Sequence, residues 1–409
     1  MRFNLMTRKA ITKEVSKRYK RSSKKEKGGI LDEFCALTGY NRTYAASLLR
    51  KGPTPGKGSR TSRGRPAGAG PGRKPVYTVE VRRALIKVWA ILDCPCGKRL
   101  IGALPETVKV LEKFGEIKLS GEVREKLLSI SASTADRLLA GERKKFTLKS
   151  RSKTKPGSML KHQIPIKTFS EWDDCRVSFL EMDLVGHDGG STSGDYCQSL
   201  DATDVASGWT ELAAVPNKAQ KWVFAAIDDM RESLPFPLMG MDSDNGSEFI
   251  NDELKRYAEK HKITFTRSRP YRKNDSCYVE QKNYTAVRRY VGYFRYDTEA
   301  ELELLNRLYR VLCPYLNFFQ PQMRLIEKVR TGSRVTKRYD KPRTPYMRLL
   351  EDADVDDLTK RKLKKQYAKL NPAELIRKIN AIQRKLFKRS EFLAAKEVKE
   401  VEQEARNFG

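Results

Sequence analysis

Three carboxylates that are widely separated in the sequence are the residues best suited to do chemistry. Asp183 lies in the apolar run Phe179 to Val185, which is typical of a strand. Asp244 opens the segment Asp244-Asn245-Gly246, and Glu280 follows it after 35 intervening residues. Clustered carboxylates repel one another unless a cation lies between them, and Mg²⁺ prefers oxygen ligands. If the fold brings the three acids together, they predict a divalent metal site.

Phosphodiester cleavage and transfer are reactions that such a site serves well. One cation activates the attacking hydroxyl and a second stabilises the leaving oxygen. Asn245-Gly246 suits a tight turn that projects Asp244 from the end of a strand. Two nearby acids are easily mistaken for ligands; we assign Asp201 to a second strand and Asp242 to a non-ligand position. His187, four residues after Asp183, is either close to the site or a loop histidine without a role.

The segments that must position these acids alternate between strand and helix patterns. Strands are predicted over 177–185, 195–201 and 209–215, joined by short Gly-, Ser- and Asp-containing connections that indicate an antiparallel meander. A helix over 219–234, a strand over 237–241, a helix over 247–260 and a strand over 263–266 follow. A last helix starts at Asp275 or Ser276 and reaches Tyr290. This order predicts an RNase H-like mixed five-stranded sheet with flanking helices.

These residues resemble the DDE motif of retroviral-type integrases and of bacterial insertion-sequence transposases. The stretch from Arg269 to Asn283 resembles the bacterial transposases specifically, and the amino-terminal His/Cys zinc domain of retroviral integrases is absent. The resemblance implies that Asp183, Asp244 and Glu280 bind two Mg²⁺ or Mn²⁺ ions. It further implies that water cleaves the end of a mobile element and that the freed 3′-OH attacks target DNA.

The residues around Glu280 include candidate DNA contacts. Asn283 matches the Glu-x-x-Asn pattern of the family, which implies that it orients DNA or the glutamate. Lys273, Lys282 and Arg288 flank Glu280, and their positions alone make them candidate contacts to backbone phosphate. The alternative for these three is a solvated helix face.

The charge of the whole chain favours a polyanionic partner. The 409 residues contain 82 Lys+Arg against 51 Asp+Glu, a net charge of +31. The part from Cys175 to Tyr290 is different, with 15 basic against 18 acidic residues. We find neither an apolar run of about 18 residues nor a signal-peptide pattern, which predicts no membrane association and a cytoplasmic, nucleoid-associated protein. The seven scattered cysteines do not indicate a disulfide framework or a structural zinc site.

The first 75 residues carry 20 Lys+Arg and four Asp+Glu. Ile30 to Leu37, Gly39 and the segment Arg42 to Arg50 have the layout of a helix-turn-helix with Asn41 as the cap of its second helix. That helix presents Arg42, Thr43 and Tyr44 near its start, where recognition helices meet base edges; an ordinary two-helix corner is the alternative. In the following Gly/Pro/Arg linker, Arg63-Gly64-Arg65-Pro66 resembles the minor-groove core of an AT-hook, although a solvated tether would have the same composition.

Helical periodicity returns after residue 75. Glu122 to Leu128, followed by a helix capped by Ser131, repeats the helix-turn-helix pattern and makes Arg137 a candidate DNA contact. Further on, residues 320–348 contain nine basic and two acidic residues with short β-like runs, which predicts a small basic DNA-binding module. Leu363 to Glu404 has the pattern of one long charged helix. Its apolar seam forms either a coiled coil between protomers or a contact with its own chain.

The sequence therefore predicts a multidomain protein with α-helical helix-turn-helix domains, an α/β RNase H-like core, and a basic, partly β C-terminal module with a terminal helix. The predicted segments are 1–52, 53–75 (linker), 76–149, 150–172 (linker), 173–318 (core), 319–350 and 351–409. The predicted function is a DDE transposase that acts on double-stranded DNA, both element ends and target, as a homo-oligomer assembled on DNA and without a small-molecule substrate. The alternatives are a catalytically silent DNA-binding regulator derived from a transposase and an RNase H-like nuclease.

Overall fold

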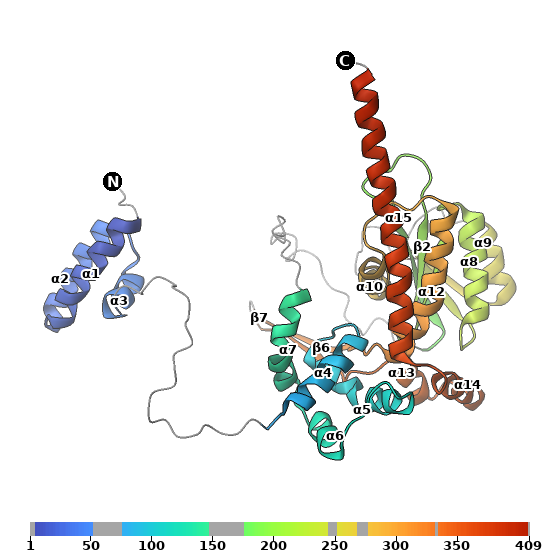
Figure 1. The fold of residues 1–409 in the computed structure, drawn as a ribbon, viewed down its shortest axis with the longest axis horizontal. Helices are drawn as coiled ribbons and strands as arrows, with labels where there is room; N and C mark the ends of the chain where they lie inside the picture. Colours follow the sequence, from blue (N-terminus) through green and yellow to red (C-terminus); the bar gives the residue numbers. More distant parts are fainter. Residues whose placement is uncertain are drawn as a thin grey trace. The chain divides into compact units, whose positions relative to one another are not determined.

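The computed structural model describes residues 5–51, 76–146, 176–243, 252–267, 277–331 and 334–407. Its contacts divide the chain into two compact units, residues 1–75 and 76–409 (Figure 1). The predicted segments 76–149, 173–318, 319–350 and 351–409 lie together in the second unit. No helix of the described ranges is long and apolar enough to cross a membrane.

The first unit is a domain of three helices. It consists of α1 (Leu5–Arg21), α2 (Lys24–Thr38) and α3 (Arg42–Lys51). The turn between α2 and α3 requires a left-handed residue, and Gly39 supplies it with φ of 67°. Asn41 caps α3 as predicted, because its Oδ1 accepts from the N–H of Thr43 at 2.9 Å. The apolar faces of the three helices form the small core of this unit, made of Tyr19, Ile30, Leu31, Phe34, Ala45 and Leu49.

The second unit begins with four helices, α4 (Val79–Ile91), α5 (Gly97–Lys113), α6 (Gly121–Leu128) and α7 (Ala132–Phe146). Ser131 caps α7 as predicted, since its Oγ accepts from the N–H of Thr134. The end of α4 joins this group of four helices to the rest of the unit. Tyr315 donates to the carbonyl of Ile91 at 2.7 Å, and the side chain of Gln320 donates to the carbonyl of Leu92 at 2.9 Å.

The centre of the second unit is a mixed five-stranded sheet, as predicted. Its strands are β1 (Phe179–Gly186), β2 (Gln198–Asp204), β3 (Thr210–Val215), β4 (Gly240–Ser243) and β5 (Thr264–Arg267), in the order β3-β2-β1-β4-β5. β1, β2 and β3 form the antiparallel meander, whereas β4 and β5 run parallel to β1. α8 (Gln220–Ser233) and α9 (Asp252–His261) connect β3 to β4 and β4 to β5. In Figure 1 the sheet stands between these two helices and α10.

The predicted second strand, residues 195–201, is misplaced by three residues. The observed strand starts at Gln198 because the preceding segment folds around one arginine. The guanidinium of Arg295 donates to the carbonyls of Ser191, Ser193 and Asp195 at 2.8 to 3.2 Å. These bonds to a residue about 100 positions away hold the segment out of the sheet, and a local pattern does not reveal them.

The last helix of the core is not a regular α-helix. It starts as α10 (Cys277–Lys282), continues as the π-helical turn η3 (Asn283–Arg288) and ends with α11 (Arg289–Val291). A π-helical turn changes the angular spacing of side chains and often occurs at functional sites. Here it follows directly after the segment that carries Glu280.

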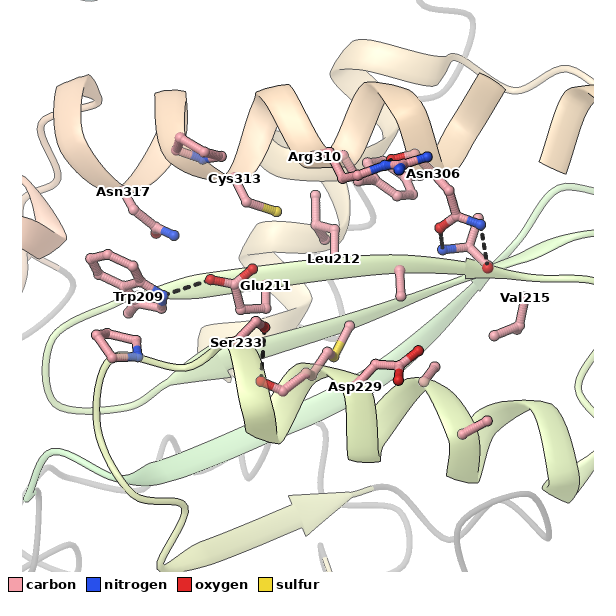
Figure 2. A pocket seen from close by; sticks show the side chains of 18 of the residues that line it. Trp209, Glu211, Leu212, Val215, Asp229, Ser233, Asn306, Arg310, Cys313 and Asn317 are labelled. Atoms are coloured by element: carbon pink, nitrogen blue, oxygen red, sulfur yellow. Dashed lines mark hydrogen bonds between the residues drawn. The ribbon is translucent and has the colours of Figure 1, made fainter. Parts of the chain in front are cut away.

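The long helix α12 (Glu299–Phe319) packs along β3, one of the two edge strands of the sheet. The amide of Asn306 accepts from the N–H of Ala214 and donates to its carbonyl, and Asn317 makes the same two bonds with Thr210. Figure 2 shows the Asn306 pair at the end of β3. Side-chain amides thus satisfy backbone groups of the edge strand that would otherwise pair with another chain.

The C-terminal part contains a two-stranded ribbon and three helices. The ribbon consists of β6 (Leu325–Thr331) and β7 (Arg334–Tyr339), and it is followed by α13 (Pro345–Glu351), α14 (Asp357–Tyr367) and α15 (Pro372–Asn407). The prediction of one helix from Leu363 to Glu404 is wrong, because the chain breaks between α14 and α15. Proline is favoured at the first position of a helix, where its missing N–H costs nothing, and Pro372 is the first residue of α15. Asn371 caps this helix by accepting from the N–H of Ala373.

The apolar seam of α15 packs on its own chain. Leu375, Ile379, Ile382 and Leu386 are buried in the core of the second unit. Gln383 also donates to the carbonyl of Tyr290 at 2.8 Å. Of the two alternatives for this seam, the structure therefore favours the contact within the chain over a coiled coil between protomers.

Candidate active site

The elements that contain or precede the three predicted acids, β1, β4 and α10, lie next to one another at the centre of the sheet. Asp183 lies on β1, the middle strand. Its chain neighbour Met182 is in register with Ser243 on β4, and Ser243 directly precedes Asp244 in the sequence. Asp244 itself lies outside the described residues. For Glu280 the structure describes the backbone, within α10, but not the side chain.

Two hydrogen bonds hold the helix of Glu280 against β1. The N–H of Val279 donates to Oε2 of Glu181 at 3.0 Å, and Nδ2 of Asn283 donates to Oδ2 of Asp183 at 2.6 Å. Glu181 and Asp183 are two residues apart on one strand, so they share a face of the sheet. The helix is therefore bonded to that face of the sheet both before Glu280, at Val279, and after it, at Asn283.

Asp201 is on the predicted strand, but its cross-strand neighbour could not be predicted. It lies on β2 as we expected, but in register with Asp183, so the two carboxylates are direct cross-strand neighbours on one face. Asp201 is fully buried, and its Oδ2 has no hydrogen-bond partner among the described residues. Burial raises the pKa of Asp201, and the positive charge of Lys282 opposes that rise.

Lys282 and Arg288 have partners inside the chain. Nζ of Lys282 donates to the carbonyl of Gly208 at 3.3 Å, and burial lowers the pKa of this lysine while the charge of Asp201 opposes the change. The guanidinium of Arg288 donates to the carbonyl of Gly186, at the end of β1, at 2.6 Å. Both side chains tie the helix of Glu280 to the sheet. Contacts of Lys282, Arg288 and Asn283 with DNA stay predictions.

His187 is buried in a chain of hydrogen bonds away from solvent. Its Nε2 lies 2.7 Å from Oγ of Ser199, which in turn lies 2.5 Å from the hydroxyl of Tyr309. Burial and, to a smaller extent, the charge of nearby Arg288 lower the pKa of His187 to about 3. Of the two alternatives, a place near the site or a loop histidine without a role, the second is closer, since His187 directly follows β1 outside any strand or helix and its ring is buried. It is a neutral part of the core.

The other acid that we set aside, Asp242, also has a local partner. It lies on β4, and its Oδ1 accepts from the hydroxyl of Thr266 on β5 at 2.6 Å. Asp242 is in register with Glu181 rather than with Asp183. This geometry makes Asp242 a suitable reference residue for tests of Asp244, two positions later in the chain.

The predicted contacts of the helical regions occupy exposed positions where they are described. Arg42, Thr43 and Tyr44 are exposed at the start of α3; Arg42 forms an ion pair with Asp32, and the ring of Tyr44 packs edge-on against Tyr40. Arg137 is exposed on α7. Three further candidates, Arg63, Arg65 and Lys273, lie outside the described residues.

A pocket of about 860 Å³ lies elsewhere, along β3 and between α8, α12 and α14. Figure 2 shows Glu211 at this pocket, with its carboxylate accepting from Nε1 of Trp209 at 2.8 Å. Burial raises the pKa of Glu211 to about 7. None of Asp183, Asn283 and Lys282 lines this pocket, so it is separate from the candidate active site.

Comparison with known proteins gives the same class of core. Residues 174–273 match the family model of the integrase core domain. The chain is 39% identical over 347 residues to the uncharacterized protein y4rM of Sinorhizobium fredii (strain NBRC 101917 / NGR234), a match that covers 85% of this chain and 96% of the relative. Among solved structures, the catalytic core domain of BIV integrase is 17% identical, with a TM-score of 0.29, over 42% of this chain and 94% of that one.

The sheet order and the family match together show an RNase H-like, integrase-type core. The chain belongs to the same family as y4rM, over nearly the whole length of that relative.

Proposed function

We propose that the protein is a DDE transposase that binds the ends of a mobile DNA element and joins them to target DNA. One observation carries the proposal. β4 pairs with β1 one residue before Asp244 and Asp183, and the helix of Glu280 is bonded to β1 at the residue before the glutamate. The fold therefore brings together Met182, Ser243 and Val279, and each of the three predicted acids is the next residue in the sequence after one of them.

The donor chemistry of this place fits divalent ions. Asp183 and Asp201 are cross-strand neighbours, and like charges in direct opposition destabilise a sheet unless a cation offsets them. The buried Oδ2 of Asp201 without a partner is a further sign that positive charge belongs here. Asp183, Asp244 and Glu280 would hold two Mg²⁺ or Mn²⁺ ions, which supply activation of the attacking oxygen and stabilisation of the leaving oxygen.

The residues around the acids have positioning roles in this proposal. Asn283 holds one oxygen of Asp183 and thereby sets the direction of the other. Glu181, Lys282 and Arg288 fix the helix that carries Glu280 against β1 and the β2–β3 turn. The exposed residues Arg42, Thr43, Tyr44 and Arg137, together with Arg63, Arg65 and Lys273, are the proposed contacts to duplex DNA, and the protein is proposed to work as a homo-oligomer assembled on it.

The reaction consists of two phosphoryl transfers. In the first, the oxygen of water forms a bond to phosphorus at the element end, the bond from phosphorus to the 3′-oxygen breaks, and that oxygen leaves as a 3′-OH. In the second, this 3′-OH attacks a target phosphate and displaces the 3′-oxygen of the target strand, which takes up a proton. The number of phosphodiester bonds is unchanged in the second step.

The test is a joining assay with the purified full-length chain. Labelled duplexes that carry the DNA ends flanking the coding sequence are incubated with a target plasmid and Mg²⁺. We expect the label to become covalently joined to the plasmid. Cleavage without joining would identify the nuclease alternative, and sequence-specific binding without either reaction would identify the regulator.

A further inference from the structure

The β6–β7 ribbon is the most open part of the second unit. Residues 326–330 and 335–339 are all exposed, so neither face of the ribbon is covered by another described element. Its exposed apolar side chains include Ile326 and Val335, which are 55% and 41% exposed. A two-stranded ribbon is at best marginally stable alone. An uncovered ribbon of this kind is therefore expected to have a partner.

The two faces of the ribbon differ in charge. Lys328 is directly opposite Lys337, and the next pair on the same face is Arg330 with Val335. The other face has Glu327 opposite Arg338, an ion pair with an N–O distance of 3.9 Å, and Val329 opposite Thr336. One face thus includes an acid that pairs with a base, whereas the other is basic without an acid among its described residues.

The pair of lysines is unfavourable without a counter-charge. Like charges directly opposite each other on antiparallel strands destabilise the pairing. Neither Lys328 nor Lys337 forms an ion pair with a residue of the described ranges. Because a row of phosphates would neutralise both lysines together, the register points to a polyanion on this face.

Hydrogen bonds connect the base of the ribbon to the candidate active site. Asp340 accepts from the N–H of Arg324 and from the guanidinium of Arg348, both at 2.6 Å. Gln322 donates to the carbonyl of Gly208, which also accepts from Lys282, two residues after Glu280. Gln322, which precedes the ribbon, and the helix of Glu280 therefore both bind the carbonyl oxygen of Gly208. A duplex bound to the ribbon would consequently have a defined position relative to that helix.

We propose that the basic face of the β6–β7 ribbon, formed by Lys328, Arg330 and Lys337, binds the phosphate backbone of double-stranded DNA. The major groove of B-DNA admits a two-stranded ribbon, so this element has the size to lie along or within it. The inference rests on the proposed function insofar as duplex DNA is the substrate of that function. Beyond that function, the inference assigns the duplex to one face of one element, the β6–β7 ribbon.

Neighbouring residues on opposite faces provide a matched test. Lys337→Glu and Arg338→Glu make the same change of charge at adjacent positions. Binding of a labelled 30-base-pair duplex is measured by fluorescence anisotropy with the full chain carrying Asp183→Asn, in EDTA and over a series of salt concentrations. We expect Lys337→Glu to raise Kd about three- to tenfold and to lower the slope of log Kd against log salt by about one. Arg338→Glu should change Kd less than about twofold.

The outcomes separate this inference from the proposed function. Equal effects of the two variants, or no effect of Lys337→Glu while the parent binds DNA, would overturn the assignment of the face. Failure of the parent itself to bind duplex DNA would count against the proposed function as well. If an RNA duplex binds more tightly than DNA and depends on Lys337 in the same way, the proposal of DNA as the ligand of this face would be overturned in favour of RNA. Far-UV circular dichroism and melting temperature show whether each variant is folded.

Discussion

At the scale of single residues, the sequence suggested which acids could act together, but it did not reveal their neighbours. Asp183 was identified from its position in an apolar run. Asp201 was assigned to the correct strand, yet only the β1–β2 register shows that it is opposite Asp183. Glu181 was missed, although its position two residues before Asp183 places it on the same face of a strand. Its partner, the N–H of Val279, is 98 residues away in the chain and has no local signal.

Asn283 offers a direct test of positioning. Asn283→Ala removes the donor to Oδ2 of Asp183, so that the bond from the N–H of Leu184 to Oδ1 no longer acts together with it to orient the carboxylate. Since groups that orient metal ligands typically contribute ~10–100-fold, we expect the joining rate to fall by that factor and the half-saturating Mn²⁺ concentration to rise. Thr285→Ala, which removes only a bond to the carbonyl of Gln281 within the same helix, is the control. A similar loss in both variants would contradict the role of Asn283.

Glu211 predicts a pH dependence of stability. Burial raises its pKa from 4.5 to about 7 in the folded protein. A group with a raised folded-state pKa contributes stability below its unfolded pKa, and that contribution is lost as the pH rises to the folded value. Glu211→Gln retains an acceptor for Trp209 but does not ionise. The melting temperature of the variant relative to the wild type should therefore increase between pH 4.5 and 7 and stay constant above pH 8; parallel curves would refute the assignment.

At the scale of elements, the strands and helices of the core follow their sequence patterns closely, and the exceptions have long-range causes. β2 starts three residues later than predicted because Arg295 holds the preceding segment. The break before Pro372 was missed because the apolar seam continues through it. The π-helical turn after α10 was also not predicted. It places Asn283 and Arg288, five positions apart, where both reach β1.

The closure of the β3 edge by α12 predicts a stability defect. Asn317→Leu keeps the side chain's size but leaves the N–H and the carbonyl of Thr210 without partners. Each unsatisfied buried group costs about 1–3 kcal/mol, so the melting temperature of the second unit should fall by several degrees. Arg307→Ala, at an exposed position of the same helix, should leave it unchanged. An unchanged melting temperature in Asn317→Leu would show that α12 does not seal this edge.

At the scale of the whole molecule, the division into two compact units was partly predictable. Composition separates the basic first 75 residues from the rest, and the contacts give the same division. Composition did not reveal that the helical region beginning with α4 is packed with the integrase-like core. That packing depends on single hydrogen bonds such as the one from Tyr315 to Ile91, between residues over 200 positions apart.

Separate units predict separable properties. A chain consisting of residues 76–409 should keep the melting temperature of the second unit, because its core contains no residue of the first. If the first helix-turn-helix reads sequence, this shortened chain should lose preference for element ends over random duplex while it retains non-specific binding. Competition binding assays compare the two duplexes. Retained preference would place sequence recognition in the second unit.

The central claim is that Asp244, rather than a neighbouring acid, acts with Asp183 and Glu280 on a metal-dependent joining reaction. The most direct measurement compares Asp244→Asn with Asp242→Asn in the joining assay with Mg²⁺ and with Mn²⁺. Both variants remove one carboxylate charge from the same short segment. We predict that Asp244→Asn abolishes joined products with either ion, whereas Asp242→Asn retains them at a rate within about tenfold of the wild type. Joined products at an unchanged rate in Asp244→Asn would contradict the account.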